Sequence, residues 1–168
     1  EDCKIIFPGV GNFNHAMKVL NTEGWIQPLK YQVIEKKKMF LGICLGMQLM
    51  ATKGYENDIE CDGLNFINSK VINLKKLGCK LKVPHTGWNG INIQNKNDIL
   101  KDISHVSDFY FNHSCAFIPE NKDIVVSTTI HKIEFASIIN YQNIYGMQFH
   151  PEKSGDAGKK LLKNFLYL

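Results

Sequence analysis

Residues 41–48 read LGICLGMQ, in which Cys44 stands two positions after Gly42 and two positions before Gly46. An apolar run precedes the cysteine and helix-forming residues follow it, so the stretch predicts a strand, a tight turn and a helix. This unit is typical of parallel strands in the α/β class. Two interpretations of the turn remain open: a buried structural thiol, or a nucleophile presented to a substrate.

A nucleophile elbow would explain both glycines. In such a turn the nucleophile takes strained backbone angles, and side chains two residues away would collide with the helix and the neighbouring strand. The Cys44 sulfur would lie at the helix N-terminus, where we expect free N–H groups to lower the pKa of the thiol. The N–H of Leu45 would then point at an oxyanion formed on a carbonyl group attacked by the sulfur.

A nucleophilic cysteine needs a base, and His150 is the best candidate among the six histidines. It follows an apolar run, residues 144–149, that we expect to be a strand of the same sheet, and Pro151 ends that strand. The carboxylate of Glu152 can return to the imidazole and fix its tautomer and orientation. A cysteine, a histidine and a carboxylate form the triad that acyl transfer uses.

The composition narrows the class of protein. A chain of 168 residues with 44% hydrophobic and 21% charged residues is typical of one soluble globular domain, which we place over residues 1–168. The net charge of +4 is mild and no basic stripe alternates with aromatic residues, so no nucleic-acid partner is expected. The uncharged stretch 39–52 is too short to span a bilayer, so no membrane partner is expected either.

The five cysteines are odd in number and form no CxxC pair. They therefore predict neither a disulfide framework nor a zinc site, and they favour a reducing cytoplasm. The hydrophobic periodicity predicts helices over residues 12–24, 25–37, 45–52 and 157–166. It predicts strands over residues 5–7, 39–43, 70–74, 109–111, 124–127, 135–139 and 144–149. Asn12 or Asn14 would cap the first helix.

Five segments repeat a pattern known from one enzyme family. They are PGVG at 8–11, GICLGMQ at 42–48, KVPH at 82–85, GWN at 87–89 and QFHPEKS at 148–154. Together they resemble the class I (triad) glutamine amidotransferases, most of all the glutaminase subunits of imidazole glycerol phosphate synthase. The similarity runs from residue 5 to residue 165. It implies a flavodoxin-like mixed sheet flanked by helices, and we expect the N-terminal strand and helix of that fold to be missing here.

The resemblance also implies an activity and a set of site residues. The activity is hydrolysis of glutamine to glutamate and ammonia, with Cys44 as nucleophile, His150 as general acid and base, and Glu152 as the orienting carboxylate. No metal and no cofactor are implied. The remaining implied residues are the oxyanion-hole donors Leu45, Val10 and Gly11, and the substrate-binding residues Gly9, Gln48, His113 and Ser114.

A partner that receives the ammonia is implied as well. In this family the glutaminase passes ammonia to a synthase or cyclase subunit of the (βα)₈-barrel type, which acts in histidine biosynthesis. The residues expected to contact that subunit are Pro84, His85, Trp88 and Asn89. Two other interpretations stay open: a relative that supplies ammonia for amidation of a surface-polysaccharide sugar, and an inactive subunit that binds without turnover. A cysteine peptidase is a weaker alternative, because the HPE segment and Gln48 favour a small amide substrate.

Overall fold

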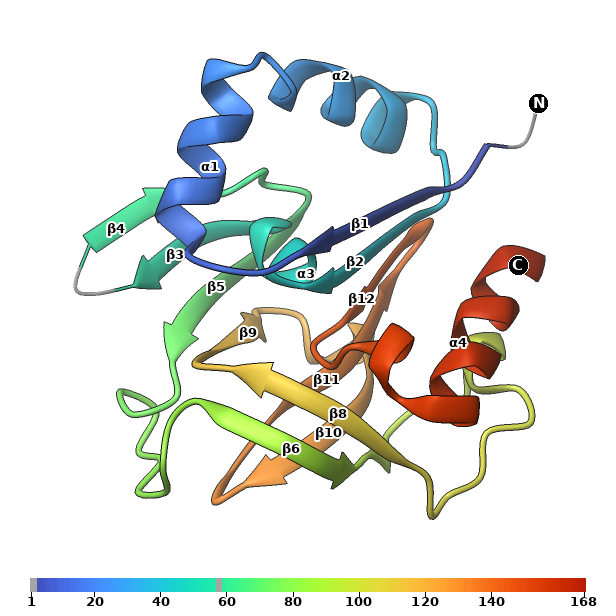
Figure 1. The fold of residues 1–168 in the computed structure, drawn as a ribbon. Helices are drawn as coiled ribbons and strands as arrows, with labels where there is room; N and C mark the ends of the chain where they lie inside the picture. The colour runs from blue at the N-terminus through green and yellow to red at the C-terminus, as the bar shows by residue number, and fades with distance from the viewer. Residues whose placement is uncertain (1–2, 57–58) are drawn as a thin grey trace.

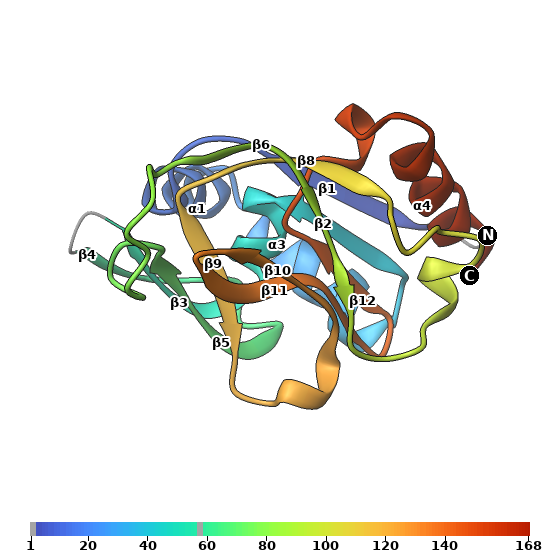
Figure 2. The same cartoon turned by 90° about the horizontal axis from the view of Figure 1, so that it is seen from below.

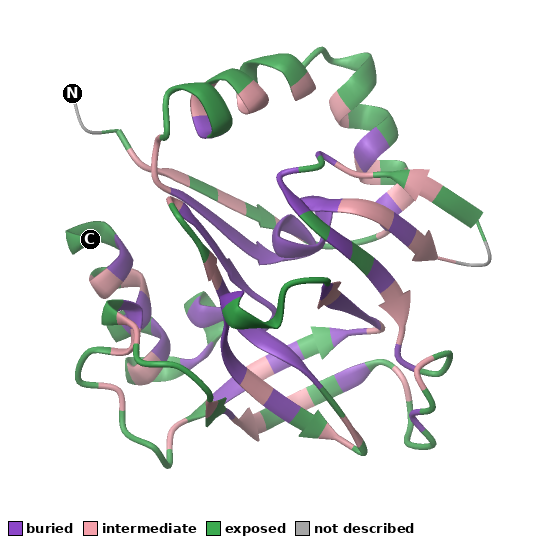
Figure 3. Ribbon diagram, turned by 180° about the vertical axis from the view of Figure 1, so that it is seen from behind, coloured by how far each residue is buried: buried purple, intermediate pink, exposed green. Residues whose placement is uncertain are grey.

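The structure is a computed structural model that describes residues 3–56 and 59–168. Its largest sheet is mixed, and β1, β2 and β12 run parallel while the other neighbours run antiparallel. The strand order is β1 (Ile5–Gly9), β2 (Phe40–Cys44), β12 (Ile144–Met147), β11 (Ile133–Tyr141), β10 (Val125–His131) and β7 (Asn92–Ile93). β2 and β12 lie inside this sheet and are buried along their whole length (Figure 3).

Helices cover both faces of this sheet. One face carries α1 (Phe13–Thr22), α2 (Ile26–Lys30), its π-helical continuation Tyr31–Glu35, and α3 (Leu45–Leu49), whereas α4 (Gly155–Tyr167) lies on the other face (Figure 1). Phe40 belongs to the apolar core under α1, and its neighbour Leu41 belongs to the core under α4. The neighbours Phe40 and Leu41 therefore fill two separate cores, as expected for a central strand covered on both sides.

Two smaller sheets extend the fold. One contains, in order, β4 (Ile59–Asp62), β3 (Ala51–Glu56), β5 (Ile67–Asn73) and β9 (Cys115–Pro119). The other is the antiparallel pair of β6 (His85–Gly90) and β8 (Asp108–His113), which run side by side in both views (Figures 1 and 2). Three short 3₁₀ helices complete the described chain: Asp98–Leu100, Lys122–Ile124 and Pro151–Lys153. Among the described residues, no helix is long and apolar enough to cross a membrane.

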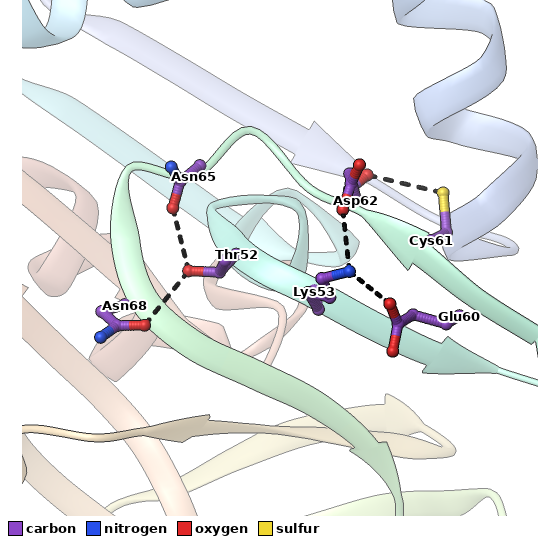
Figure 4. Close-up of polar contacts among 7 residues, drawn as sticks. All are labelled: Thr52, Lys53, Glu60, Cys61, Asp62, Asn65 and Asn68. Carbon is purple, nitrogen blue, oxygen red and sulfur yellow. Dashed lines mark hydrogen bonds and ion pairs between the residues drawn. The ribbon is translucent and has the colours of Figure 1, made fainter.

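The hairpin of β3 and β4 is held by polar contacts on its exposed side (Figure 4). Lys53 forms ion pairs with Glu60 and with Asp62, the latter at 3.3 Å. The hydroxyl of Thr52, at the start of the hairpin, contacts the side chains of Asn65 at 2.9 Å and Asn68 at 3.4 Å. Exposed pairs of this kind contribute little stability each, so their effect is mainly to fix the path of β3.

Most elements expected from the sequence are present. Of the two candidate caps of the first helix, Asn12 is used: its side-chain oxygen accepts the N–H of His15 at 2.9 Å. The helix expected to reach residue 52 is wrong at its end, because α3 stops at Leu49 and the chain enters β3 at Ala51. The strand expected over 144–149 ends at Met147. The strands β3, β4, β6, β7 and β9 were not expected.

Candidate active site

The turn after β2 has the geometry of a nucleophile elbow. Cys44 takes φ 52° and ψ −110°, a strained combination for a residue with a side chain. A Cβ added to Gly42 would lie 2.7 Å from the Gly46 carbonyl oxygen in α3, and one added to Gly46 would lie 1.8 Å from the Phe7 carbonyl oxygen in β1. The expected collisions with the helix and with the neighbouring strand are therefore both confirmed.

The expectation that the helix N-terminus lowers the pKa of the Cys44 thiol is wrong. Burial raises its pKa from 9.0 to about 11, and the charge of Glu152 raises it further. The hydrogen bond from the Leu45 N–H and the charge of Lys153 lower the pKa, but their effect is smaller than that of burial. The thiol is only 5% exposed, and desolvation disfavours its charged form. The sulfur therefore carries its proton at neutral pH unless a base removes it.

His150 and Glu152 lie in contact with each other. The imidazole Nδ1 is 2.8 Å from Glu152 Oε1, and the ring is buried whereas the carboxylate is partly exposed. The His150 N–H donates to the Tyr110 carbonyl at 2.8 Å, and the Ser154 hydroxyl donates to the His150 carbonyl at 2.6 Å. Since β2 and β12 are parallel neighbours, Cys44 and the segment after Met147 reach the same edge of the sheet.

A cavity of about 220 Å³ opens at this edge. Eight of the predicted site residues line it: Val10, Gly11, Cys44, Leu45, Gln48, Pro84, His113 and Ser114. The wall also contains Glu56, Asn112 and Cys115. The predicted residues Gly9, His150, Glu152, His85, Trp88 and Asn89 are not part of the described lining. The structure therefore gathers Cys44, the predicted nucleophile, and most predicted substrate-binding residues around one space.

Besides Asn112 and Cys115, two residues at or near the cavity wall were not predicted from the sequence. Glu56, at the end of β3, is the one carboxylate among the described residues that line the cavity, and its Oε2 accepts the Phe13 N–H at 2.7 Å. Gln148 is fully buried, and its side-chain Nε2 lies 3.8 Å from the Cys44 sulfur. Gln148 had a detectable signal, because a polar residue in an apolar strand segment needs a buried partner. Glu56 had none.

The histidine expected to bind substrate is engaged elsewhere. His113 Nδ1 lies 2.8 Å from the Cys115 carbonyl oxygen, which can only accept, so Nδ1 carries the proton. His113 Nε2 then accepts from His85 Nδ1 at 3.0 Å, and His85 Nε2 accepts from the Asn89 amide at 3.3 Å. Burial lowers the pKa of His113 to about 3 and that of His85 to about 4, so both rings are neutral at pH 7.

Neither imidazole nitrogen of His113 is therefore left for a ligand, and its ring serves as a wall of the cavity. His85 is 4% exposed and lies behind the surface on which a partner contact was expected. Trp88, on the same strand, is 58% exposed and available to a partner. The expected contact surface is thus divided: Trp88 and Pro84 face outward, whereas His85 supports the pocket wall through His113.

The chain is similar to known proteins over almost its whole length. The family model described as "Glutamine amidotransferase class-I" matches residues 2–168. The "Imidazole glycerol phosphate synthase subunit HisH 1" of Campylobacter jejuni is 45% identical over 168 residues, covering 98% of this chain and 81% of its own length. The "Imidazole glycerol phosphate synthase subunit HisH" of Pelagibacter ubique is 40% identical over 166 residues, covering 98% and 79%.

A solved structure supports the architecture. The crystal structure of a glutamine amidotransferase from Thermotoga maritima superposes with a TM-score of 0.64 at 19% identity, covering 97% of this chain and 61% of that chain. At such low identity the likeness bears on the fold alone. It confirms the fold class expected from the sequence, a mixed α/β sheet flanked by helices of the glutamine amidotransferase type.

Proposed function

Because the chain belongs to the glutamine amidotransferase class-I family, we propose that it hydrolyses glutamine to glutamate and ammonia through Cys44, His150 and Glu152. One observation carries the proposal: the strained elbow holds the Cys44 sulfur in the wall of a cavity, at the sheet edge where His150 contacts Glu152. A cysteine, a base and a group that orients the base are what covalent acyl transfer requires.

The first half of the reaction forms a thioester. His150 takes the proton of the buried thiol, and the Cys44 thiolate attacks the side-chain amide carbon of glutamine. The carbonyl electrons move to oxygen, and the oxyanion is stabilised by the Leu45 N–H and by an N–H of the exposed loop at Val10 and Gly11. When the oxyanion collapses, the C–N bond breaks and His150 returns the proton to the leaving nitrogen as ammonia.

The second half regenerates the enzyme. His150 removes a proton from water, and the resulting hydroxide attacks the γ-glutamyl thioester. The C–S bond breaks, glutamate leaves, and the proton on His150 restores the Cys44 thiol. Glu152 keeps the imidazole oriented and stabilises its charged form in both halves through the 2.8 Å contact.

The cavity lining suggests how the other end of glutamine is held. Glutamine carries an α-ammonium group, and Glu56 offers the matching negative charge in the cavity wall. Gln48 contributes its amide oxygen, because both hydrogens of its nitrogen are used by the Cys115 carbonyl and by Gln148. A small amino acid amide fits these groups better than a peptide, which lacks a free ammonium at that distance from its scissile bond.

Replacing Glu56 by glutamine tests this placement of substrate. We expect KM for glutamine to rise about 10-fold or more, with a much smaller change in kcat, because a charged hydrogen bond is lost while an oxygen that accepts the Phe13 N–H is kept. Steady-state kinetics of glutamate release measure both constants. Glu60→Gln on the same hairpin is the matched control and should leave KM unchanged. An unchanged KM in Glu56→Gln would place the ammonium elsewhere.

The names of the relatives point to one partner. We propose that this chain is the glutaminase subunit of imidazole glycerol phosphate synthase and passes ammonia directly to a cyclase subunit of the (βα)₈-barrel type. Exposed apolar side chains support a covering partner: Val10 lines the cavity and is 76% exposed, and Trp88, on the strand β6 that follows Pro84, is 58% exposed. Direct transfer also prevents protonation of the ammonia by bulk water.

Glutamate release by the purified protein, alone and with the cyclase subunit loaded with its substrate, tests this assignment. We expect the partner to raise the rate about 10²–10³-fold, the effect typical of completing an oxyanion hole. Turnover that ignores the cyclase would instead support a different ammonia acceptor, such as a sugar amidation system. A folded protein without turnover under either condition would support a binding subunit.

A further inference from the structure

The side chain of Gln148 joins the nucleophile to the substrate pocket. Gln148 follows β12, its backbone N–H donates to the Ser137 carbonyl at 2.9 Å, and its side chain is fully buried. On one side the amide contacts Gln48, and on the other side it contacts the Cys44 sulfur. A buried amide of this kind requires partners, and here both partners belong to the candidate active site.

The neighbouring groups determine which way this amide points. The Cys115 carbonyl can only accept, so the Gln48 atom 2.9 Å away is its nitrogen. The same Gln48 nitrogen lies 3.0 Å from the Gln148 side chain, which must present its oxygen there. The Gln148 nitrogen is therefore the atom that faces Cys44 Sγ, at 3.8 Å, and it carries a hydrogen toward the sulfur.

The Cys44 sulfur thus has one contact that favours the thiol and one that favours the thiolate. The Asn112 carbonyl oxygen, also 3.8 Å away, accepts from a thiol but repels a thiolate. The Gln148 N–H donates, and a donor interacts more strongly with the charged sulfur than with the neutral one. Removing the Gln148 donor would leave the Asn112 carbonyl and burial to oppose ionisation, with the Leu45 N–H still acting in its favour.

We propose that Gln148 is a positioning residue that stabilises the Cys44 thiolate and, through the same amide, fixes Gln48 with its oxygen toward the cavity. The inference rests on the proposed function, because it assigns Gln148 a place in glutamine hydrolysis. Gln148 takes no part in bond making: it orders two groups that do contact substrate. The hydrogen-bonded series runs from Cys44 through Gln148 and Gln48 to the Cys115 carbonyl.

Alkylation of Cys44 by iodoacetamide, followed by peptide mass spectrometry over a range of pH, measures thiolate formation without any turnover. The reagent is a small amide, which suits the cavity. In the wild type we expect the rate to rise about tenfold per pH unit toward a midpoint near the raised pKa of about 11. The other ionisable groups around the sulfur, Glu152, Lys153, Glu56, Cys115, His113 and His150, are present in every variant and form a common background.

Two variants separate the two roles. Gln148→Met has similar length and no donor, so we expect alkylation at pH 8 to slow about 3- to 10-fold, and KM for glutamine to rise because Gln48 is no longer fixed. Gln148→Glu keeps an acceptor for Gln48 but offers no donor once ionised. It should move the alkylation midpoint upward at least as far, with a smaller change in KM.

Ser137→Ala is the matched control, because it removes a buried hydroxyl beside the Gln148 backbone contact without touching the sulfur. Its alkylation profile should equal that of the wild type. If Gln148→Met does not fold, Gln148→Glu decides, because it retains the shape and polarity of the site. Wild-type profiles in the folded Gln148 variants would overturn the proposal. Shifted profiles in a protein that never hydrolyses glutamine would reject the proposed function and keep the thiolate role.

Discussion

Replacing Cys44 by alanine is expected to reduce the proposed glutamine hydrolysis by about 10⁴-fold or more, both alone and with the proposed cyclase partner. The change removes the atom that forms the proposed thioester, and no neighbouring group among the described residues can replace it on the same elbow. The fold should remain intact, because alanine fits wherever the cysteine fits. Glutamate release measures the loss, and glutamine binding by calorimetry should be preserved.

A second thiol in the cavity wall, that of Cys115, allows a test of whether the loss of activity is specific to Cys44. Cys115 lines the same cavity, but burial raises the pKa of its thiol to about 12 and it lacks the Leu45 N–H that acts on Cys44. Cys115→Ala should therefore reduce the rate far less, since the carbonyl that binds Gln48 and His113 is unchanged. Cys79→Ala, which removes a buried thiol bonded to the His131 carbonyl, is the control. The assignment fails if Cys115→Ala is the variant that loses activity.

The parts of the site that follow from local sequence were predictable. Of the two glycines around Cys44, Gly46 avoids the Phe7 carbonyl of β1, a strand far earlier in the chain, whereas the collision that Gly42 avoids, with Gly46 in α3, has a local cause. The contact of His150 with Glu152 spans only two residues and was expected for the same reason. The Asn12 cap is local as well. For Gly42, for the contact of His150 with Glu152 and for the Asn12 cap, the residues that decide the geometry stand within a few positions of one another.

The parts that depend on distant segments were not predictable. The Cys44 thiol was expected to have a lowered pKa, but the fold buries it, with the Asn112 carbonyl of β8 at 3.8 Å, and burial outweighs the helix terminus. A five-residue helix also has only a weak dipole effect. The sequence could not show that both ring nitrogens of His113 are occupied, because one of their partners, His85, is placed beside it by the pairing of β6 with β8.

The unexpected strands have a similar explanation. β6 contains two glycines, an asparagine and a threonine, and the intrinsic preferences of these residues do not predict a strand. It is a strand because β8, more than twenty residues later, pairs with it from His85 to Gly90. β3 begins one residue after the helix C-cap at Met50, a transition that periodicity alone cannot resolve.

Replacing Gly46 by alanine is expected to destabilise the protein by about 3 kcal/mol or more, or to prevent folding altogether. The added Cβ would lie 1.8 Å from the Phe7 carbonyl oxygen, a backbone atom of β1 that can move only if β1 leaves its register with β2. Urea denaturation followed by circular dichroism measures the loss.

Gly90→Ala is the matched strand control, because its Cβ would meet only the Asp108 side chain at 3.6 Å, and it should change stability by less than about 0.5 kcal/mol. Equal stability of the two variants would mean that β1 does not pack against the elbow, and with it the geometric case for Cys44 as nucleophile would fail.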